Sequence, residues 1–234
     1  MLKRLVILGF GLLCQVAVSA HAAFEQRDAI FIASDFSSGI SAATNVIVDL
    51  QPAINTKAIY AERIEPKRIL AEFYQQFKLA SGQTFDPTVD GLIGEYRGYL
   101  IQAINEVMEE NHDRILAGGQ DAFVPAYFRA NVLKKVNQAM EGRLIGNITT
   151  SKRNLINHNS AVDIVLKDSP LLKEVSSLVQ EEKSFQVDRV VGSHFMSYRP
   201  LRLKSACVSC HNKHGKDQTI GGYGGAFVID IKME

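Results

Sequence analysis

The chain has 234 residues, and its 26 Lys and Arg nearly balance its 25 Asp and Glu, which gives a formal net charge of +1 at pH 7. This balance, without a basic stripe, argues against a nucleic-acid partner, and no apolar run after the N-terminal one suggests a membrane span. The length suits one domain with a sizeable core, or one domain with a helical extension.

The N-terminal segment Met1–Ala22 has the pattern of a secretory signal peptide. Lys3 and Arg4 form its charged start, an apolar run extends from Leu5 to Ala20, and an A-x-A cleavage pattern ends it. The apolar run is shorter than the roughly 18 to 20 residues of a spanning helix, so cleavage is favoured over an uncleaved anchor. We therefore expect a periplasmic protein, exported across the inner membrane, with no stable membrane span after signal cleavage.

Four helices are predicted in the first half of the chain, from apolar residues at helical spacing. The first contains Pro52, where it either ends or kinks, and the second has Pro66 in its first turn. Gly118 and Gly119 stop the third. The expected ranges are Phe24–Ile59, Pro66–Leu79, Val89–Leu116 and Ala122–Met140.

The pattern changes to strands in the second half, where short segments rich in β-branched residues appear. We expect strands over Leu144–Thr150, Val187–Tyr198, Pro200–Lys204 and Ala226–Ile231, with a turn near Arg199-Pro200. One helix, Asp168–Glu182, opens with a polar cap and a Pro. The Gly-rich run 221–225 either lets the backbone approach a neighbour closely or acts as a flexible hinge. The fold class is therefore α+β, with N-terminal helices followed by an antiparallel sheet.

Residues 207–211 read Cys-Val-Ser-Cys-His, the C-x-x-C-H attachment pattern of a c-type haem. Thiols at this spacing can each add to a haem vinyl group, and the imidazole of His211 then becomes the proximal iron ligand. A redox dithiol or half of a zinc site is the alternative, but no second Cys pair exists to complete four thiolates. Cys14 lies in the signal segment, and export supports the haem interpretation. We therefore expect one covalent haem c, bound by Cys207, Cys210 and His211.

Several short segments follow one another in an order that resembles a family of single-haem c-type proteins with a PAS-like sensor fold. Members of that family occur alone and as sensor domains of bacterial chemoreceptors and histidine kinases. The segments are Phe123-Val124-Pro125-Ala126, Lys152-Arg153-Asn154, Tyr198-Arg199-Pro200-Leu201, the C-x-x-C-H pentapeptide and Gly225-Ala226-Phe227-Val228-Ile229.

We therefore expect a signal peptide over residues 1–22 and an N-terminal helical region over 23–120, and the resemblance implies a PAS-like antiparallel sheet carrying the haem over 121–234. Two features depart from the family pattern. Some relatives ligate the iron with a cysteine of an N-terminal helix, but the mature chain has no spare Cys. The prolines that follow Arg-Asn in relatives are also absent after Arg153-Asn154, so the loop on the distal side of the haem is expected to differ.

The sixth iron ligand is left open by the sequence. His194, Met196, His158 and His112 are the candidates, because imidazole and thioether sulfur both bind haem iron. Each is also readily explained as a surface or core residue, and His194 and Met196 share one face of a predicted strand. His214 is too close to His211 to reach the opposite haem face. Three further residues, Lys204, Lys213 and Lys216, either offset the haem propionates or form a solvated basic loop.

An open sixth position would leave room for a diatomic gas, so we expect a sensor of redox state or of such a gas. A soluble periplasmic electron-transfer cytochrome is the alternative, favoured by two strong protein ligands. No distal acid–base groups or second cofactor motif indicate an enzyme. The redox partner or signalling protein is not identified by the sequence.

Overall fold

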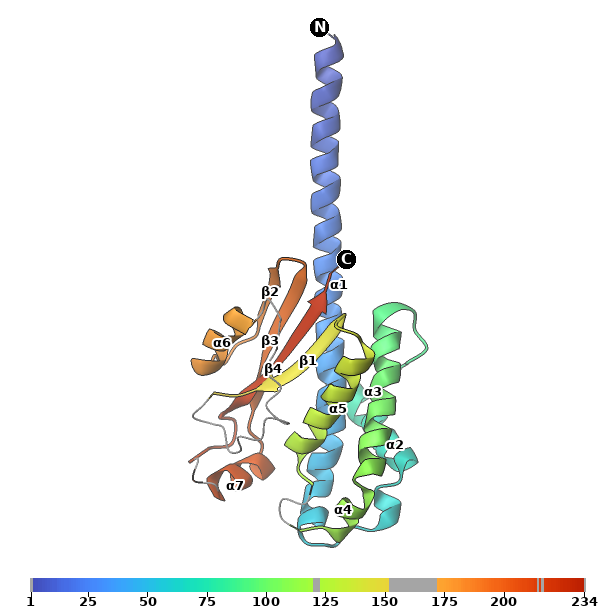
Figure 1. The fold of residues 1–234 in the computed structure, drawn as a ribbon, viewed down its shortest axis with the longest axis vertical. Helices are drawn as coiled ribbons and strands as arrows, with labels where there is room; N and C mark the ends of the chain where they lie inside the picture. Colours follow the sequence, from blue (N-terminus) through green and yellow to red (C-terminus); the bar gives the residue numbers. More distant parts are fainter. Residues whose placement is uncertain (1, 120–122, 152–171, 214, 216, 234) are drawn as a thin grey trace.

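The protein has the α+β architecture expected from its sequence, with helices first and a four-stranded antiparallel sheet later (Figure 1). The computed structural model describes residues 2–119, 123–151, 172–213, 215 and 217–233. The first half contains α1 (Leu2–Asn55), a 3-10 helix (Ala61–Arg63), α2 (Pro66–Ser81), α3 (Gly91–Glu110), α4 (His112–Ala117) and α5 (Pro125–Ala139). The second half contains β1 (Leu144–Thr149), α6 (Leu172–Gln180), β2 (Val187–Val191), β3 (His194–Arg202), α7 (Ser205–Lys213) and β4 (Tyr223–Lys232).

Helix α1 is the longest element and passes without a break through the predicted cleavage point, and its first part extends away from the body of the protein (Figure 1). It ends at Asn55, beyond Pro52 and short of the expected Ile59, because Lys57 takes a left-handed conformation with φ 58°. Within the described residues, Gln26–Asn55 is long and apolar enough to cross a membrane by length and composition, but 56% of its apolar window is buried in the protein. A helix in the core of a folded domain can have the same length and apolar composition.

The expected single helix Val89–Leu116 is wrong, because the chain breaks at Asn111 into α3 and α4. The Asn111 side-chain amide donates a hydrogen bond of 2.8 Å to the Val107 carbonyl. Such a local side-chain bond competes with the helical ladder, and helical spacing alone does not reveal it. Gly118, with φ 57°, ends α4 as expected.

The sheet has the strand order β1-β4-β3-β2, and every neighbouring pair is antiparallel. The expected turn near Arg199-Pro200 is wrong: the hairpin turns at Gly192 and Ser193, and β3 continues through Pro200. Proline is tolerated there because β2 pairs with β3 only as far as Tyr198, so Pro200 has a strand partner on one side alone.

The remaining elements agree with the expected ranges to within a few residues at their ends, apart from the start of α6. That start, Asp168-Ser169-Pro170, lies outside the described residues. The C-x-x-C-H motif, for which no helix was expected, lies in the helix α7. Gly225 belongs to β4 with φ 126°, and a Cβ there would lie 2.6 Å from the Thr149 carbonyl oxygen. The first role considered for the Gly-rich run, close backbone approach, therefore holds at Gly225.

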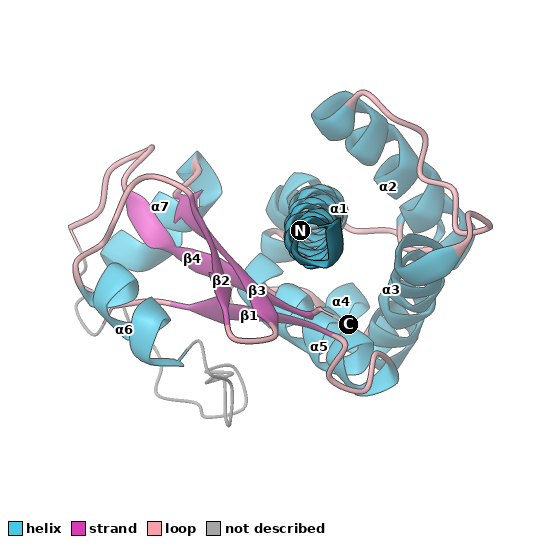
Figure 2. Ribbon diagram, turned by 90° about the horizontal axis from the view of Figure 1, so that it is seen from above, coloured by secondary structure: helices cyan, strands magenta, loops and turns pink. Residues whose placement is uncertain are grey.

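One hydrophobic core joins α1, α2, α3 and α5 to one face of the sheet. Figure 2 shows α1 end-on, with the sheet on one side and α2 and α3 on the other. A Cβ on Gly146 would lie 2.6 Å from the Phe36 ring and 2.9 Å from Leu133, so only glycine lets α1 and α5 pack this closely on β1. The core includes residues on both sides of the boundary predicted at residue 120, and that boundary stays a prediction.

A second, smaller core lies between α6 and the other face of the sheet. Its members come from α6, β3 and β4: Val175, Leu178, Val179, Met196, Tyr198, Ala226 and Val228.

A buried ion pair ties α1 to α3 inside the main core. Arg97 donates two hydrogen bonds to the Asp35 carboxylate, of 3.0 and 2.6 Å, and Tyr96 donates a third. The Arg97 guanidinium also lies 5.0 Å from the centre of the Phe85 ring and bonds the Asp86 carbonyl. Asp35 and Arg97 are about 95% buried, so each charge depends on the other for compensation.

Candidate haem site on helix α7

Helix α7 begins where β3 ends, at one end of the sheet. Leu203 links the two elements: its amide donates to the Gly222 carbonyl at 3.0 Å, and its carbonyl accepts from the Gly221 amide at 2.8 Å. Leu203 is also buried against Gly224, where an added Cβ would lie 2.8 Å from its side chain. The start of α7 is therefore fixed to the sheet by backbone bonds and by packing.

The helical conformation of α7 brings the positions of the C-x-x-C-H motif together. Residues three and four apart share one face of an α-helix, with Cβ atoms about 5 to 6 Å apart, so positions 207, 210 and 211 lie on one face. Cys207 is half-buried and is a free cysteine. His211 is also half-buried, and its Nδ1 atom is buried.

The side of α7 that carries Cys207 faces α1 and α5. Lys204, just before α7, donates a hydrogen bond of 2.5 Å from Nζ to the Asn45 Oδ1 atom on α1. On the neighbouring position of α1, the Thr44 hydroxyl accepts a bond of 3.0 Å from Nε of Arg129 on α5. Burial lowers the pKa of Arg129 to about 10, and the Cys207 side chain partly opposes that shift. Three elements therefore meet at this site.

A loop returns the chain from α7 to β4. The Asn212 side chain accepts a hydrogen bond of 2.5 Å from the Gln218 amide and donates one of 3.0 Å to the Gln218 carbonyl.

Two tyrosines lie near the start of β4. The hydroxyl of Tyr198, on β3, lies 2.9 Å from the Lys183 carbonyl and 3.2 Å from the hydroxyl of Tyr223, on β4. Burial raises the pKa of both tyrosines, so both stay neutral donors at ordinary pH.

The chemistry of this donor set fits a covalent haem. Two cysteine positions one helical turn apart match the two vinyl groups of one porphyrin edge, and the imidazole of His211 lies on the same helix face. Among the described residues, no group of three or more His, Cys, Asp or Glu could hold a metal ion.

The structure separates two of the four candidates for the sixth ligand from α7. His194 is at the start of β3, pairs with Lys232 and contacts the Asp230 carboxylate at 2.8 Å. Eight residues of strand, about 26 Å at 3.3 Å per residue, separate it from Arg202 at the α7 end. Met196 is fully buried in the smaller core under α6. The two share one sheet face, as expected, but it is the face opposite α1.

Of the other two candidates, only His112 belongs to the described part of the chain. His112 begins α4, where its exposed ring lies 3.2 Å from the Asp113 carboxylate. His158 lies outside the described residues, as do His214, Lys216 and the Lys152-Arg153-Asn154 segment. Of the lysines expected near the motif, Lys204 bonds Asn45 and Lys213 ends α7.

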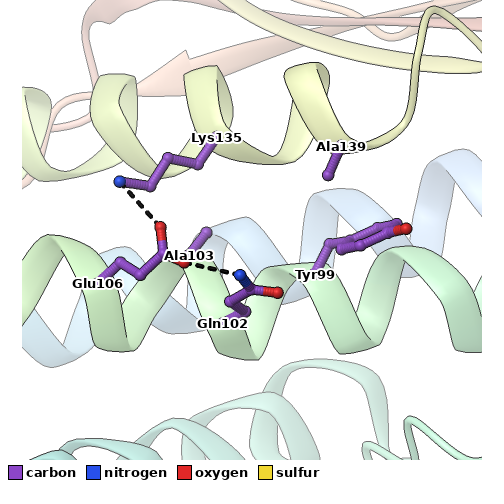
Figure 3. A pocket seen from close by; sticks show the side chains of 6 residues that line it. All are labelled: Tyr99, Gln102, Ala103, Glu106, Lys135 and Ala139. Carbon is purple, nitrogen blue, oxygen red and sulfur yellow. Dashed lines mark hydrogen bonds and ion pairs between the residues drawn. The ribbon is translucent and has the colours of Figure 1, made fainter.

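A shallow groove of about 100 Å³ lies between α3 and α5, away from the motif (Figure 3). Its charged lining is already paired, because Lys135 contacts Glu106 at 2.9 Å and Gln102 bonds the same Glu106 at 2.7 Å. This groove is therefore a salt-bridged helix interface rather than a reactive site.

Sequence reasoning missed Arg129, Thr44 and Asn45 as residues of this site. Arg129 lies three residues after the Phe123–Ala126 segment that carries part of the family resemblance, but nothing in the sequence pairs it with a serine- and threonine-rich stretch of α1. Only the packing of α5 on α1 brings them together.

The fold and the site define an α+β protein in which a C-x-x-C-H helix lies at one end of an antiparallel sheet and is linked to α1 by the Lys204–Asn45 hydrogen bond. The chain belongs to the Tll0287-like family, whose model matches residues 52–231, a range that includes α5, α7 and the described strands up to Ile231 of β4. Comparison with curated proteins and with solved structures gave no match for the chain.

Proposed function

We propose that this protein is a periplasmic mono-haem c-type cytochrome with a PAS-like domain, which senses redox state or a diatomic gas through a covalently bound haem. The observation that carries the proposal is the placement of positions 207, 210 and 211 on one face of α7. Cys207 and Cys210 would form the thioethers, and His211 would be the proximal ligand. The haem supplies an iron that changes oxidation state and exchanges ligands.

The residues opposite this face support a weak or absent sixth ligand. Between Gln26 and Asn55, α1 contains no His, Met or Cys, so the helix that meets the start of α7 at Asn45 has no strong iron ligand to offer. His194 and Met196 lie on the other side of the sheet. An iron with one open position can take up a small gas, which favours sensing over simple electron transfer.

An electron carrier is the second candidate. The loop that follows α7 is exposed, and Ile220 keeps 71% of its surface open to solvent. An exposed apolar side chain beside a haem would suit a brief contact with a redox partner. Export to the periplasm is part of both candidates, because the Met1–Ala22 segment has the signal pattern and because haem attachment occurs outside the cytoplasm.

The test is to express the chain in a bacterium that contains the haem-attachment machinery and to purify it from the periplasm. Mass spectrometry should find one haem added to a chain that starts near Ala23. The matched variant Cys207→Ser/Cys210→Ser should be exported but should carry no covalent haem. A wild-type protein that folds and stays haem-free under these conditions would falsify the proposal.

A further inference from the structure

Arg129 is a half-buried cation without an acidic partner in the part of the chain that the structure describes. Its hydrogen bond goes to a neutral hydroxyl, Thr44 Oγ1, at 3.0 Å. Two other buried or half-buried cations differ: Arg97 is paired with Asp35, and Lys135 with Glu106 and Glu110. Arg199 also donates to a neutral hydroxyl, Ser197 Oγ at 3.0 Å, but the carboxylate of Asp188 acts on it electrostatically. Removing a guanidinium from water without a carboxylate beside it is unfavourable, so the site leaves a positive charge available for an anion.

The position of this charge connects it to the candidate haem site. Thr44 and Asn45 are neighbours on α1; Thr44 binds Arg129, and Asn45 binds Lys204 at the start of α7. The Thr44 hydroxyl itself donates to the Ile40 carbonyl at 2.7 Å, so its oxygen is oriented toward Arg129. The guanidinium is thereby held at the junction of α1, α5 and the Cys207 side of α7.

We propose that Arg129 is a specificity-determining residue of this site, which raises its affinity for small anions and favours the ferrous over the ferric state. The inference rests on the proposed function and extends it by adding small anions to the diatomic gases as ligands of the site. A fixed positive charge attracts an anion that approaches the iron, and it disfavours the oxidised haem, which carries one more positive charge. Thr44 is a positioning residue, since it acts through Arg129.

The experiment compares azide binding to the ferric protein with carbon monoxide binding to the ferrous protein, by optical titration of the holoprotein. Azide is anionic and carbon monoxide is neutral, so the two ligands separate a charge effect from a change in the shape of the site. The variants are Arg129→Gln, Arg129→Lys and Thr44→Val. The matched control is Arg143→Gln. Arg143 lies beyond the C-terminal end of α5, and its charge is paired with Glu95.

Arg129→Gln should weaken azide binding on the order of tenfold and leave carbon monoxide binding unchanged. Its midpoint potential should fall, and a tenfold change in the ferric-to-ferrous ratio corresponds to about 59 mV. Arg129→Lys should retain most of the azide affinity, Thr44→Val should lose part of it, and Arg143→Gln should match the wild type.

Equal azide affinity in the wild type and Arg129→Gln would overturn the role of Arg129 while leaving the haem function intact. A wild-type ferric protein that takes up no azide would overturn it as well. If Arg129→Gln does not fold, the Arg129→Lys and Thr44→Val titrations decide the question. An azide affinity equal to that of the wild type in both of these variants rejects the proposal. A chain that carries no haem would instead reject the proposed function itself, and this inference with it.

Discussion

At the residue scale, His211 is the position on which the haem proposal depends most directly. The residue follows Cys210 directly and lies about one helical turn from Cys207 on α7, and its Nδ1 atom is buried. We predict that His211→Ala keeps the covalent haem but alters the Soret band and the spin state, because the thioethers do not require the imidazole. Optical and magnetic spectra of the purified variant check this, with the exposed His112→Ala as a control. Identical spectra for His211→Ala and the wild type would mean that the iron takes its axial ligand elsewhere.

The Asp35–Arg97 pair sets a second residue-scale expectation, for stability. Arg97→Met leaves the Asp35 carboxylate buried without its cation, and it should lower the free energy of unfolding by about 3 to 5 kcal/mol. Urea denaturation of the purified protein measures this change. The double variant Asp35→Leu/Arg97→Met should recover much of the loss, because no charge then remains buried. An Arg97→Met variant as stable as the wild type would contradict the interpretation that Arg97 compensates the buried charge of Asp35.

At the element scale, the sequence predicted most helices and strands but not how they end or turn. Apolar spacing and Pro66 located α2, and β-branched residues located β1. The break at Asn111 depends on one side-chain bond, and the course of β3 through Pro200 depends on where its partner strand stops. Both are tertiary or local hydrogen-bond effects that a periodic pattern does not contain.

The candidate site shows the same division between sequence and structure. Cys207, Cys210 and His211 were predictable because their chemistry requires a fixed spacing along the chain. Arg129 and Thr44 are 85 positions apart, and no sequence spacing links them. Only the folded helices establish that contact.

The contact between α3 and α5 gives an element-scale prediction on pH. The pKa of Glu106 is lowered mainly by its hydrogen bond from Lys135, and that of Lys135 is raised mainly by its bonds to Glu110 and Glu106. The stabilisation is therefore present between the ordinary pKa values of 4.5 and 10.5. It is lost as the pH falls through the lowered pKa of Glu106, or rises through the raised pKa of Lys135.

We expect Lys135→Met to lower the urea midpoint at pH 7, and we expect this difference from the wild type to shrink below about pH 4. The neighbouring Lys134→Met is the matched control, since Lys134 is exposed and makes no ion pair in the described part of the chain. A difference between Lys135→Met and the wild type that stays constant down to pH 3 would show that apolar contacts, and not the ion pairs, explain the effect.

At the scale of the whole molecule, the helices of the N-terminal half are part of the site and not an appendage to it. The core that joins α1 and α5 to the sheet also places Thr44, Asn45 and Arg129 beside α7. The hydrogen bond from Lys204 to Asn45 therefore connects the start of α7 with the longest element of the protein.

Carbon monoxide binding tests whether the assembled molecule offers an open iron position. We predict that the reduced protein binds this gas readily and shifts its Soret band, because α1 has no His, Met or Cys between Gln26 and Asn55. Optical titration of the reduced protein up to millimolar gas measures this, and the oxidised protein, which should not respond, is its control.

If the gas fails to bind, a strong sixth ligand is present, and His158→Ala is the first variant to examine. His194, Met196 and His112 follow it, because the fold separates His194 and Met196 from α7 and pairs His112 with Asp113. Gas binding restored by any one of these variants would identify the ligand and would favour the electron carrier over the sensor.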